Sequence, residues 1–343
     1  LVVQLLPVDE LSSAIDLKNF GSSILAPACI DAQVYGAGDL LFSLHPTVQT
    51  LQTMYETFAT TGTCLFQPTI ATNTISVFKN CIDAVKRYWA GGGKGVHGLH
   101  LEGPWLNPQK AGAHVKEWMH TPTVEEVGDL LAYGKDAITM ITLAPEMCSS
   151  EIIALLRKNN IVISAGHSNA TYQQAMQSFD EGIGTVTHLY NAMSGLQHRA
   201  PGLVGAAFQN QTVMSSVIPD GHHVDYAAIA IAKKIMGERL FAITDAVTTT
   251  SEGPYRHEAV GDKYECNGTL SGSALSMHTA FLNLVNEVGI EEDEALRMCA
   301  VYPARALGID DAHGKIATGY AAEFVCMSDT YNNPKLVTET TGW

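Results

Sequence analysis

Eight short apolar runs divide this chain, and segments with helical periodicity separate most of them. The apolar runs lie near Ile24, Cys64, Leu99, Ile141, Ile163, Thr187, Val217 and Ile243, and clear helical segments cover residues 47–61, 76–90, 149–160 and 225–237. Strand–helix alternation repeated eight times predicts a (β/α)8 TIM-like barrel, which is an α/β fold. The alternative is an open doubly wound sheet. That fold would need a phosphate-binding loop after its first strand, and no G-x-G-x-x-G pattern stands there.

The two ends of the chain have a different pattern, with short strand-like stretches and turns instead of strand–helix pairs. Residues 1–25 and the tail that begins at Gly314 both read this way. We expect the two ends to pair into a small β-sandwich domain beside the barrel. The predicted organisation is therefore a small domain built from residues 1–25 and 314–343 and a barrel over residues 26–313.

The charge balance limits the partners of this protein. The chain has 35 acidic and 20 basic residues, a net charge of −15, which argues against a nucleic-acid or anionic membrane surface. No apolar run reaches the roughly 20 residues that cross a bilayer, and no signal peptide is visible. The seven cysteines are widely spaced without a C-x-x-C motif, so we expect reduced thiols and a cytoplasmic protein.

Residues with catalytic or metal-binding chemistry stand where four of the apolar runs end. These residues are Glu102, His167, His188 and Asp245, and the alternation of side chains along a strand allows each to face the barrel mouth. Two histidines and one carboxylate form a common ligand set for a catalytic zinc that keeps one position open. Asp245 is then a candidate general base. Taken singly, each histidine is more often a hydrogen-bonded core or loop residue.

Seven short sequences carry a family resemblance. They are GLHLEGPWLN from Gly98, AGHSNATY from Ala165, THLYNAMSG from Thr187, DGHHVDY from Asp220, TDA from Thr244, GTLSGSALSM from Gly268 and YPARALG from Tyr302. In this order they resemble the N-acetylglucosamine-6-phosphate deacetylases of the amidohydrolase superfamily, and the resemblance runs from Leu25 to Met327.

The resemblance implies metal-dependent hydrolysis of N-acetylglucosamine 6-phosphate to glucosamine 6-phosphate and acetate, in amino-sugar catabolism. It assigns metal binding to Glu102, His167 and His188, acid–base catalysis to Asp245, and polarisation of the acetyl carbonyl, together with the metal, to His223. The positions that match substrate contacts are Ala113, His114, Asn191, Ala192, Arg199, His223, Leu270, Ser271 and Gly272, with the phosphate assigned to His114 and Arg199. A phosphate contact in this family can come from a neighbouring subunit, which implies a homodimer or a dimer of dimers.

The chain departs from the wider superfamily in its first strand. Many amidohydrolases carry His-x-His there and bind a second metal, whereas this chain has Gln33-Val34-Tyr35. The departure predicts one divalent metal per chain, zinc in the first place, with iron, cobalt and manganese also compatible with the ligand set. The fourth run also lacks a lysine for a bridging carbamate, and the segment Thr248 to Asn267 is shorter than expected.

Two other functions remain open from the sequence. One is an amidohydrolase that acts on a different amide or a cyclic ureide, and the other is a metal-free barrel that serves as a binding module. The roles of two further histidines are also open. His100 either orients Glu102 or fills the barrel, and His222 is expected to point away from its neighbour His223.

Overall fold

The computed structural model describes residues 1–6 and 19–338 of the 343-residue chain. Its main element is a sheet of eight parallel strands in the order β11-β10-β9-β8-β7-β6-β5-β2. The strands are β2 (Cys29–Val34), β5 (Thr63–Ala71), β6 (Leu99–Glu102), β7 (Ile138–Leu143), β8 (Val162–Ala165), β9 (Thr185–Val186), β10 (Met214–Val217) and β11 (Leu240–Ala242). Each corresponds to one apolar run of the sequence, so the predicted order of strands is confirmed.

The sheet closes where the chain beyond β11 meets β2. The backbone amide of Asp245 donates to the carbonyl of Gln33 at 3.0 Å, and the amide of Tyr35 donates to the carbonyl of Ala246 at 2.9 Å. A parallel bridge between Val34 and Ala246 continues this pairing. The eighth strand therefore reaches the first, and the predicted (β/α)8 barrel is confirmed.

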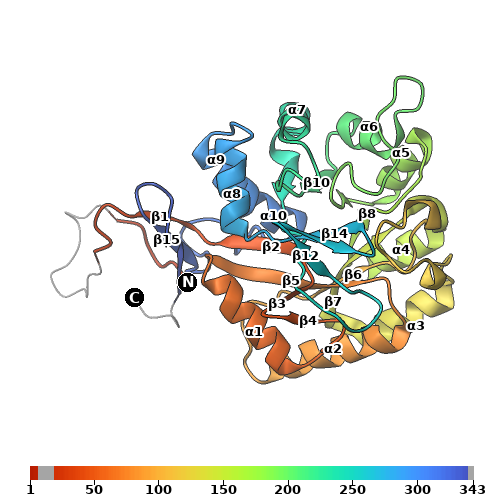
Figure 1. Ribbon diagram of the computed structural model, residues 1–343, viewed down its shortest axis with the longest axis horizontal. Helices are drawn as coiled ribbons and strands as arrows, with labels where there is room; N and C mark the ends of the chain where they lie inside the picture. Colours follow the sequence, from red (N-terminus) through yellow and green to blue (C-terminus); the bar gives the residue numbers. More distant parts are fainter. Residues whose placement is uncertain (7–18, 339–343) are drawn as a thin grey trace.

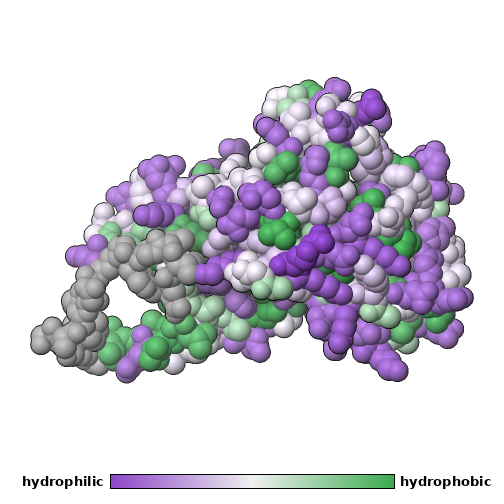
Figure 2. All heavy atoms as spheres, turned by 90° about the horizontal axis from the view of Figure 1, so that it is seen from below, coloured by the Kyte–Doolittle hydropathy of each residue, from purple (hydrophilic) through white to green (hydrophobic). Residues whose placement is uncertain are grey.

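Helices follow the strands and surround the sheet (Figure 1). They are α1 (Val48–Ala59), α2 (Ile75–Ala90), α3 (Val124–Gly134), α4 (Ser150–Lys158), α5 (Tyr172–Glu181), α6 (Gly202–Gln209), α7 (Tyr226–Met236), α8 (Met277–Asn286), α9 (Glu292–Cys299) and α10 (Val301–Ala306). Many begin at a serine or threonine whose side chain caps the first turn, as Thr171 does for α5. Figure 2 shows hydrophilic residues interspersed with smaller hydrophobic patches on the face seen from below.

The two chain ends meet in a small antiparallel sheet at one end of the molecule (Figure 1). It contains β1 (Ile24–Pro27), β15 (Phe324–Met327) and β16 (Lys335–Val337), and its buried core includes Ala26, Val325 and Met327. The expected pairing of the two ends is confirmed, and the described residues contribute one three-stranded sheet. The boundaries at residues 25 and 313 stay predictions, and residues 7–18 and 339–343 of the end segments lie outside the described part.

Two insertions lie near the C-terminal ends of the barrel strands. A hairpin of β3 (Gly36–Ala37) and β4 (Leu40–Leu41) follows the first strand, and a sheet of β12 (Glu258–Val260), β13 (Lys263–Cys266) and β14 (Thr269–Ser273) follows the eighth. A parallel bridge from Ala246 to Ser273 attaches β14 to the barrel. The short segment from Thr248 to Asn267 therefore supplies β12 and β13, which pair with β14 in a compact sheet beside the barrel mouth.

Two expectations about the whole chain concern cysteines and membranes. All seven cysteines lie in the described part and are free thiols, and five of them are buried. Among the described helices, none combines the length and the apolar character that crossing a bilayer requires.

Candidate metal and catalytic site

The barrel brings the four strand-end residues together at one mouth. Glu102 is the last residue of β6, and His167, His188 and Asp245 follow β8, β9 and β11 within three residues. All four are buried, and the last three have left-handed backbones, with φ of 46°, 35° and 54°. Such conformations are rare for residues other than glycine and concentrate at functional sites. Here they turn the chain sharply at each strand end.

A cavity of about 160 Å³ opens above these residues. Most of the predicted site residues line it: Glu102, Ala113, His114, His167, His188, Asn191, Ala192, His223, Asp245, Leu270 and Ser271. Gly272 lies beside the cavity wall instead. A Cβ at that position would come within 2.6 Å of the Val247 side chain and 3.0 Å of the Asp245 carbonyl oxygen, so a glycine is needed there.

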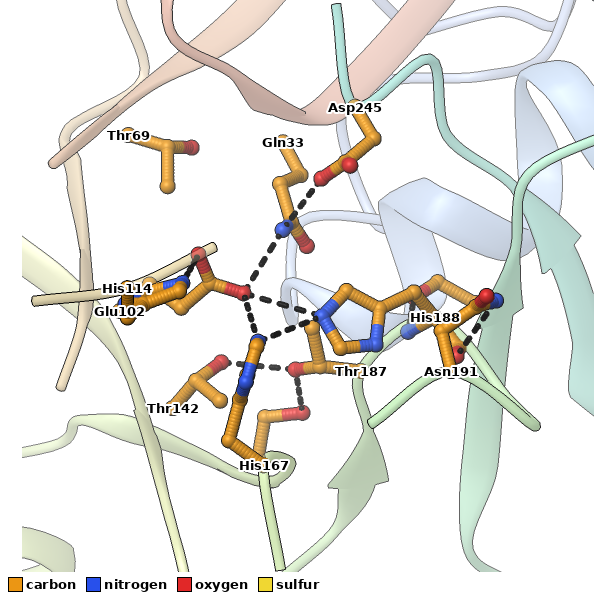
Figure 3. Close-up of polar contacts among 12 residues, drawn as sticks. Gln33, Thr69, Glu102, His114, Thr142, His167, Thr187, His188, Asn191 and Asp245 are labelled. Carbon is orange, nitrogen blue, oxygen red and sulfur yellow. Dashed lines mark hydrogen bonds and ion pairs between the residues drawn. The ribbon is translucent and has the colours of Figure 1, made fainter. Parts of the chain in front are cut away.

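Three ligand-type atoms converge at the base of the cavity (Figure 3). Oε1 of Glu102 lies 3.3 Å from Nε2 of His167 and 3.0 Å from Nε2 of His188. The two Nε2 atoms are 3.1 Å apart. All three side chains are almost completely buried, so a cation at this point would meet bulk water only through the cavity.

The tautomer of His167 shows that these three atoms suit a metal. Its Nδ1 lies 2.9 Å from the carbonyl oxygen of Lys110, which only accepts, so Nδ1 carries the hydrogen. Nε2 of the neutral ring then directs a lone pair toward Oε1 of Glu102. Two acceptors at this distance need a cation or a shared proton between them. A histidine that donates its other nitrogen to a backbone carbonyl is typical of metal ligands.

His188 also directs its Nε2 toward Glu102. Unlike Nδ1 of His167, its Nδ1 is buried without a hydrogen-bond partner among the described residues, so no contact fixes its tautomer. The donor set of two imidazole nitrogens and one carboxylate oxygen therefore matches a divalent metal such as zinc.

His114 lies beside His167, with ring centroids 4.3 Å apart, but has the opposite tautomer. Its Nδ1 accepts from the backbone amide of Thr72 at 3.2 Å, so its Nε2 carries the hydrogen and donates to Oε2 of Glu102 at 3.0 Å. Distance alone groups Glu102, His114 and His167, whose ligand atoms lie within 4.8 Å of one another. The tautomer makes His114 a donor to Glu102 and not a ligand. Both ring nitrogens of His114 already have protein partners. The phosphate contact predicted for His114 stays a prediction.

The charge state of Glu102 follows from its neighbours. Burial by itself would raise the pKa of Glu102, but the attraction and hydrogen bonds of His114, His167 and His188 lower this pKa well below its usual range. Glu102 is therefore ionised, as a metal ligand must be.

Asp245 faces Glu102 across the cavity. Its Oδ1 accepts a hydrogen bond from Nε2 of Gln33 at 2.7 Å (Figure 3). Its Oδ2 lies 3.9 Å from Nε2 of His223. Burial raises the pKa of Asp245, and the negative charge of Glu102 raises it further. A carboxyl group with a raised pKa can both accept and return a proton near neutral pH.

His223 is fixed by a carboxylate behind it. Its Nδ1 donates to Oδ2 of Asp220 at 2.6 Å, which turns Nε2 toward the cavity and Asp245. His222 points the other way, as expected, and its Nε2 contacts Oδ1 of Asp262 at 2.7 Å. His100 lies deeper in the barrel and contacts the Ala32 carbonyl and the Thr142 hydroxyl. His100 thus links barrel strands.

Two sets of contacts at the site were not predicted from the sequence. Gln33 and Tyr35 were noted only as departures from His-x-His, yet both touch Glu102. Glu146 was not noted at all, and it accepts hydrogen bonds from the loops that follow β6 and β8. The signal for Glu146 was its place directly after a barrel strand.

Arg199 is the predicted contact that lies apart from the others. It lines a separate cavity of about 410 Å³ together with Lys110, on the exposed loop that precedes α6. The cavity lined by Glu102 and Asp245 does not include it.

Comparisons with known sequences point in one direction. A sequence model of the amidohydrolase family matches residues 24–341. The chain is 33% identical over 342 residues to the N-acetylglucosamine-6-phosphate deacetylase of Haemophilus influenzae. This match covers 96% of this chain and 89% of the relative. It is also 33% identical over 318 residues to the N-acetylgalactosamine-6-phosphate deacetylase of Escherichia coli. This match covers 89% of this chain and 84% of the relative.

Solved structures agree with these sequences. The N-acetylglucosamine-6-phosphate deacetylase of Pasteurella multocida matches with a TM-score of 0.92 and 33% identity, over 98% of this chain and 92% of the other. A mutant of the Mycobacterium smegmatis enzyme in complex with N-acetyl-D-glucosamine-6-phosphate matches with a TM-score of 0.88 and 29% identity. This match covers 96% of this chain and 89% of the other.

Proposed function

The chain belongs to the amidohydrolase family, and we propose that it removes the acetyl group from N-acetylglucosamine 6-phosphate, producing glucosamine 6-phosphate and acetate. The observation that carries the proposal is the convergence of Glu102, His167 and His188 opposite Asp245 in one buried cavity. The relatives and structures named above support this substrate. N-acetylgalactosamine 6-phosphate is a second candidate. The deacetylase named for that sugar and the deacetylase from Haemophilus influenzae are each 33% identical to this chain.

We propose that Glu102, His167 and His188 hold one divalent metal, with zinc expected first. A metal bound there supplies Lewis acidity, which acidifies a water molecule and polarises a carbonyl oxygen. The tautomer of His167 and the convergence of Nε2 of His188 on the same point support this assignment. Gln33 and Tyr35 lie beside Glu102 in place of a second pair of imidazoles, which supports one metal per chain.

Asp245 is proposed to move the proton of the reaction. Its carboxylate accepts a proton from the water molecule that attacks the acetyl carbon. It then returns this proton to the nitrogen of the departing amine, which is a poor leaving group unless it is protonated. The raised pKa of Asp245 and its position on the cavity wall support both steps.

His223 is proposed to bind the acetyl carbonyl oxygen. Asp220 accepts from its Nδ1 and thereby directs Nε2, with any hydrogen that this nitrogen carries, into the cavity. A fixed donor at this place stabilises the negative charge that develops on the oxygen during attack.

The phosphate is proposed to bind to Arg199 of a neighbouring protomer. Arg199 lies on an exposed loop outside the cavity that holds Asp245, which supports a contact across a dimer interface. Arginine suits phosphate because its planar fork forms two charge-assisted hydrogen bonds. A homodimer or dimer of dimers is therefore part of the proposal. A cytoplasmic location is also proposed and is supported by the seven free cysteines.

The test is acetate release from the two phosphorylated sugars, each assayed with and without a chelator. We expect release from N-acetylglucosamine 6-phosphate that a chelator abolishes and that added metal restores. Faster release from N-acetylgalactosamine 6-phosphate would move the assignment to that sugar. Activity only on a cyclic ureide or another amide would overturn both, and a purified protein without metal or activity would indicate a binding module.

A further inference from the structure

Tyr35 places its hydroxyl between the two carboxylates of the site. The hydroxyl donates to Oε2 of Glu102, accepts from Nε2 of Gln33 at 2.8 Å and lies 3.4 Å from Oδ1 of Asp245. The side chain is 8% exposed and lines the cavity. A phenol with these three contacts lies where it can control both acidic groups.

The first effect of Tyr35 is on which oxygen of Glu102 is available. Oε2 accepts from Tyr35 and also from Nε2 of His114 at 3.0 Å, so two donors occupy it. Oε1 faces Nε2 of both His167 and His188. The carboxylate is thereby held in one rotation, with a single oxygen directed at the ligand cluster.

The second effect concerns Asp245 and passes through Gln33. Nε2 of Gln33 lies 2.7 Å from Oδ1 of Asp245 and 3.1 Å from Oε1 of Glu102. Two ionised carboxylates this close to a common donor repel each other in a buried site. The donors of Gln33 and Tyr35 offset this repulsion without adding a positive charge, so the two carboxylates can lie side by side.

We infer that Tyr35 is a positioning residue, which holds Glu102 so that one oxygen faces the metal and, with Gln33, keeps Asp245 beside it. Partners that orient a metal ligand raise metal affinity about 10- to 100-fold. The effect on turnover rests on the proposed function, whereas the effect on metal affinity does not.

The experiment compares Tyr35→Phe with Tyr88→Phe. Both changes remove one phenol hydroxyl from a buried tyrosine, and that of Tyr88 donates to the Lys94 carbonyl in the loop after α2, outside the cavity. Cobalt binding to metal-free protein is measured by competition with a chelator, together with the visible absorption of the bound cobalt. Thermal unfolding of the metal-free proteins and kcat and KM at saturating metal are measured in parallel.

For Tyr35→Phe we expect the cobalt dissociation constant to rise about 10- to 100-fold, with a changed cobalt spectrum. At saturating metal we expect kcat to fall more than KM changes. Tyr88→Phe should keep the cobalt affinity and spectrum of the unmodified protein. An unchanged affinity and spectrum in Tyr35→Phe overturns the inference, and so does a failure of that variant alone to fold. If the unmodified protein binds cobalt but releases no acetate, the proposed function fails, while the affinity comparison still decides the role of Tyr35.

Discussion

At the residue scale, two neighbouring histidines both present Nε2 to the same carboxylate, but in opposite tautomers. His167 is protonated on Nδ1 by its contact with the Lys110 carbonyl, and His114 is protonated on Nε2 because a backbone amide donates to its Nδ1. One ring therefore offers a lone pair to the centre of the site, and the other donates a hydrogen to Glu102. Residue type alone does not separate these roles, since each histidine can adopt either tautomer.

Glu102→Gln should lose both metal and activity. The amide is a neutral and much weaker ligand than the carboxylate, and its nitrogen would repel the donors that now face Oε2. Elemental analysis of dialysed protein measures the metal content, with unmodified protein as the reference. Full metal occupancy in the variant would remove Glu102 from the ligand set.

Asp245→Asn should keep the metal and lose turnover. Asparagine preserves the shape of the side chain but cannot accept the proton, so kcat should fall by about 10²–10⁴-fold, the range for general acid–base groups. The measurement is kcat for acetate release, with metal content determined on the same sample. A variant with a normal kcat would show that another group moves the proton.

At the element scale, the short 3-10 helix that follows β7, Pro145–Met147, joins the loops on either side of it. Glu146 accepts from the Asn107 side chain at 2.9 Å and from the Ser168 hydroxyl at 2.7 Å, and it also contacts the backbone amide of Asn169. The backbone amide of Asn107 in turn donates to the carbonyl of His167. One carboxylate thus fixes the loop that carries a proposed metal ligand.

Glu146→Ala should destabilise the fold and weaken metal binding. Three donors lose their acceptor, and leaving one buried donor unpaired costs about 1–3 kcal/mol. Urea unfolding measures the stability, and chelator competition measures the metal affinity. The control is Glu151→Ala on the exposed first turn of α4, which should change neither quantity appreciably. Equal behaviour of the two variants would contradict the role given to Glu146.

At the scale of the whole molecule, a buried aspartate bridges the seam between the first and last barrel strands. Asp31 on β2 is 3% exposed, and it accepts from the backbone amide of Thr244 at 3.2 Å and from the hydroxyl of the same residue. Burial raises the pKa of Asp31 to about 7, although the hydrogen bonds from Thr244 oppose the shift. The folded protein therefore retains a proton there that the unfolded chain releases at lower pH.

This difference predicts how stability depends on pH. Between pH about 4 and about 7 the folded state binds more protons at Asp31 than the unfolded state, so the free energy of unfolding should fall as pH rises through this range. Asp31→Asn should remove that part of the slope and be more stable than the unmodified protein at pH 8. Urea unfolding across the pH range measures both curves, and Asp129→Asn at an exposed position is the control. Parallel curves for the unmodified protein and Asp31→Asn would show that Asp31 does not titrate in this range.

The sequence by itself determined the barrel and the residues at its mouth. Strand and helix periodicity are local properties, so they placed the eight strands in order. The rule that barrel chemistry lies at strand C-termini then selected Glu102, His167, His188 and Asp245, which the fold brings together. The resemblance assigned Arg199 to the phosphate, but its separation from the cavity could not be read from the sequence.

Only the tertiary structure decided how these side chains contact one another. Gln33 reaches Asp245 across 212 positions of sequence, and Tyr35 reaches Glu102 across 67. Such contacts depend on barrel closure between β2 and the end of the eighth strand, and no local pattern encodes that register. The same holds for the tautomers of His114 and His167, because a hydrogen's place on the ring depends on backbone groups brought near by the loops above the barrel.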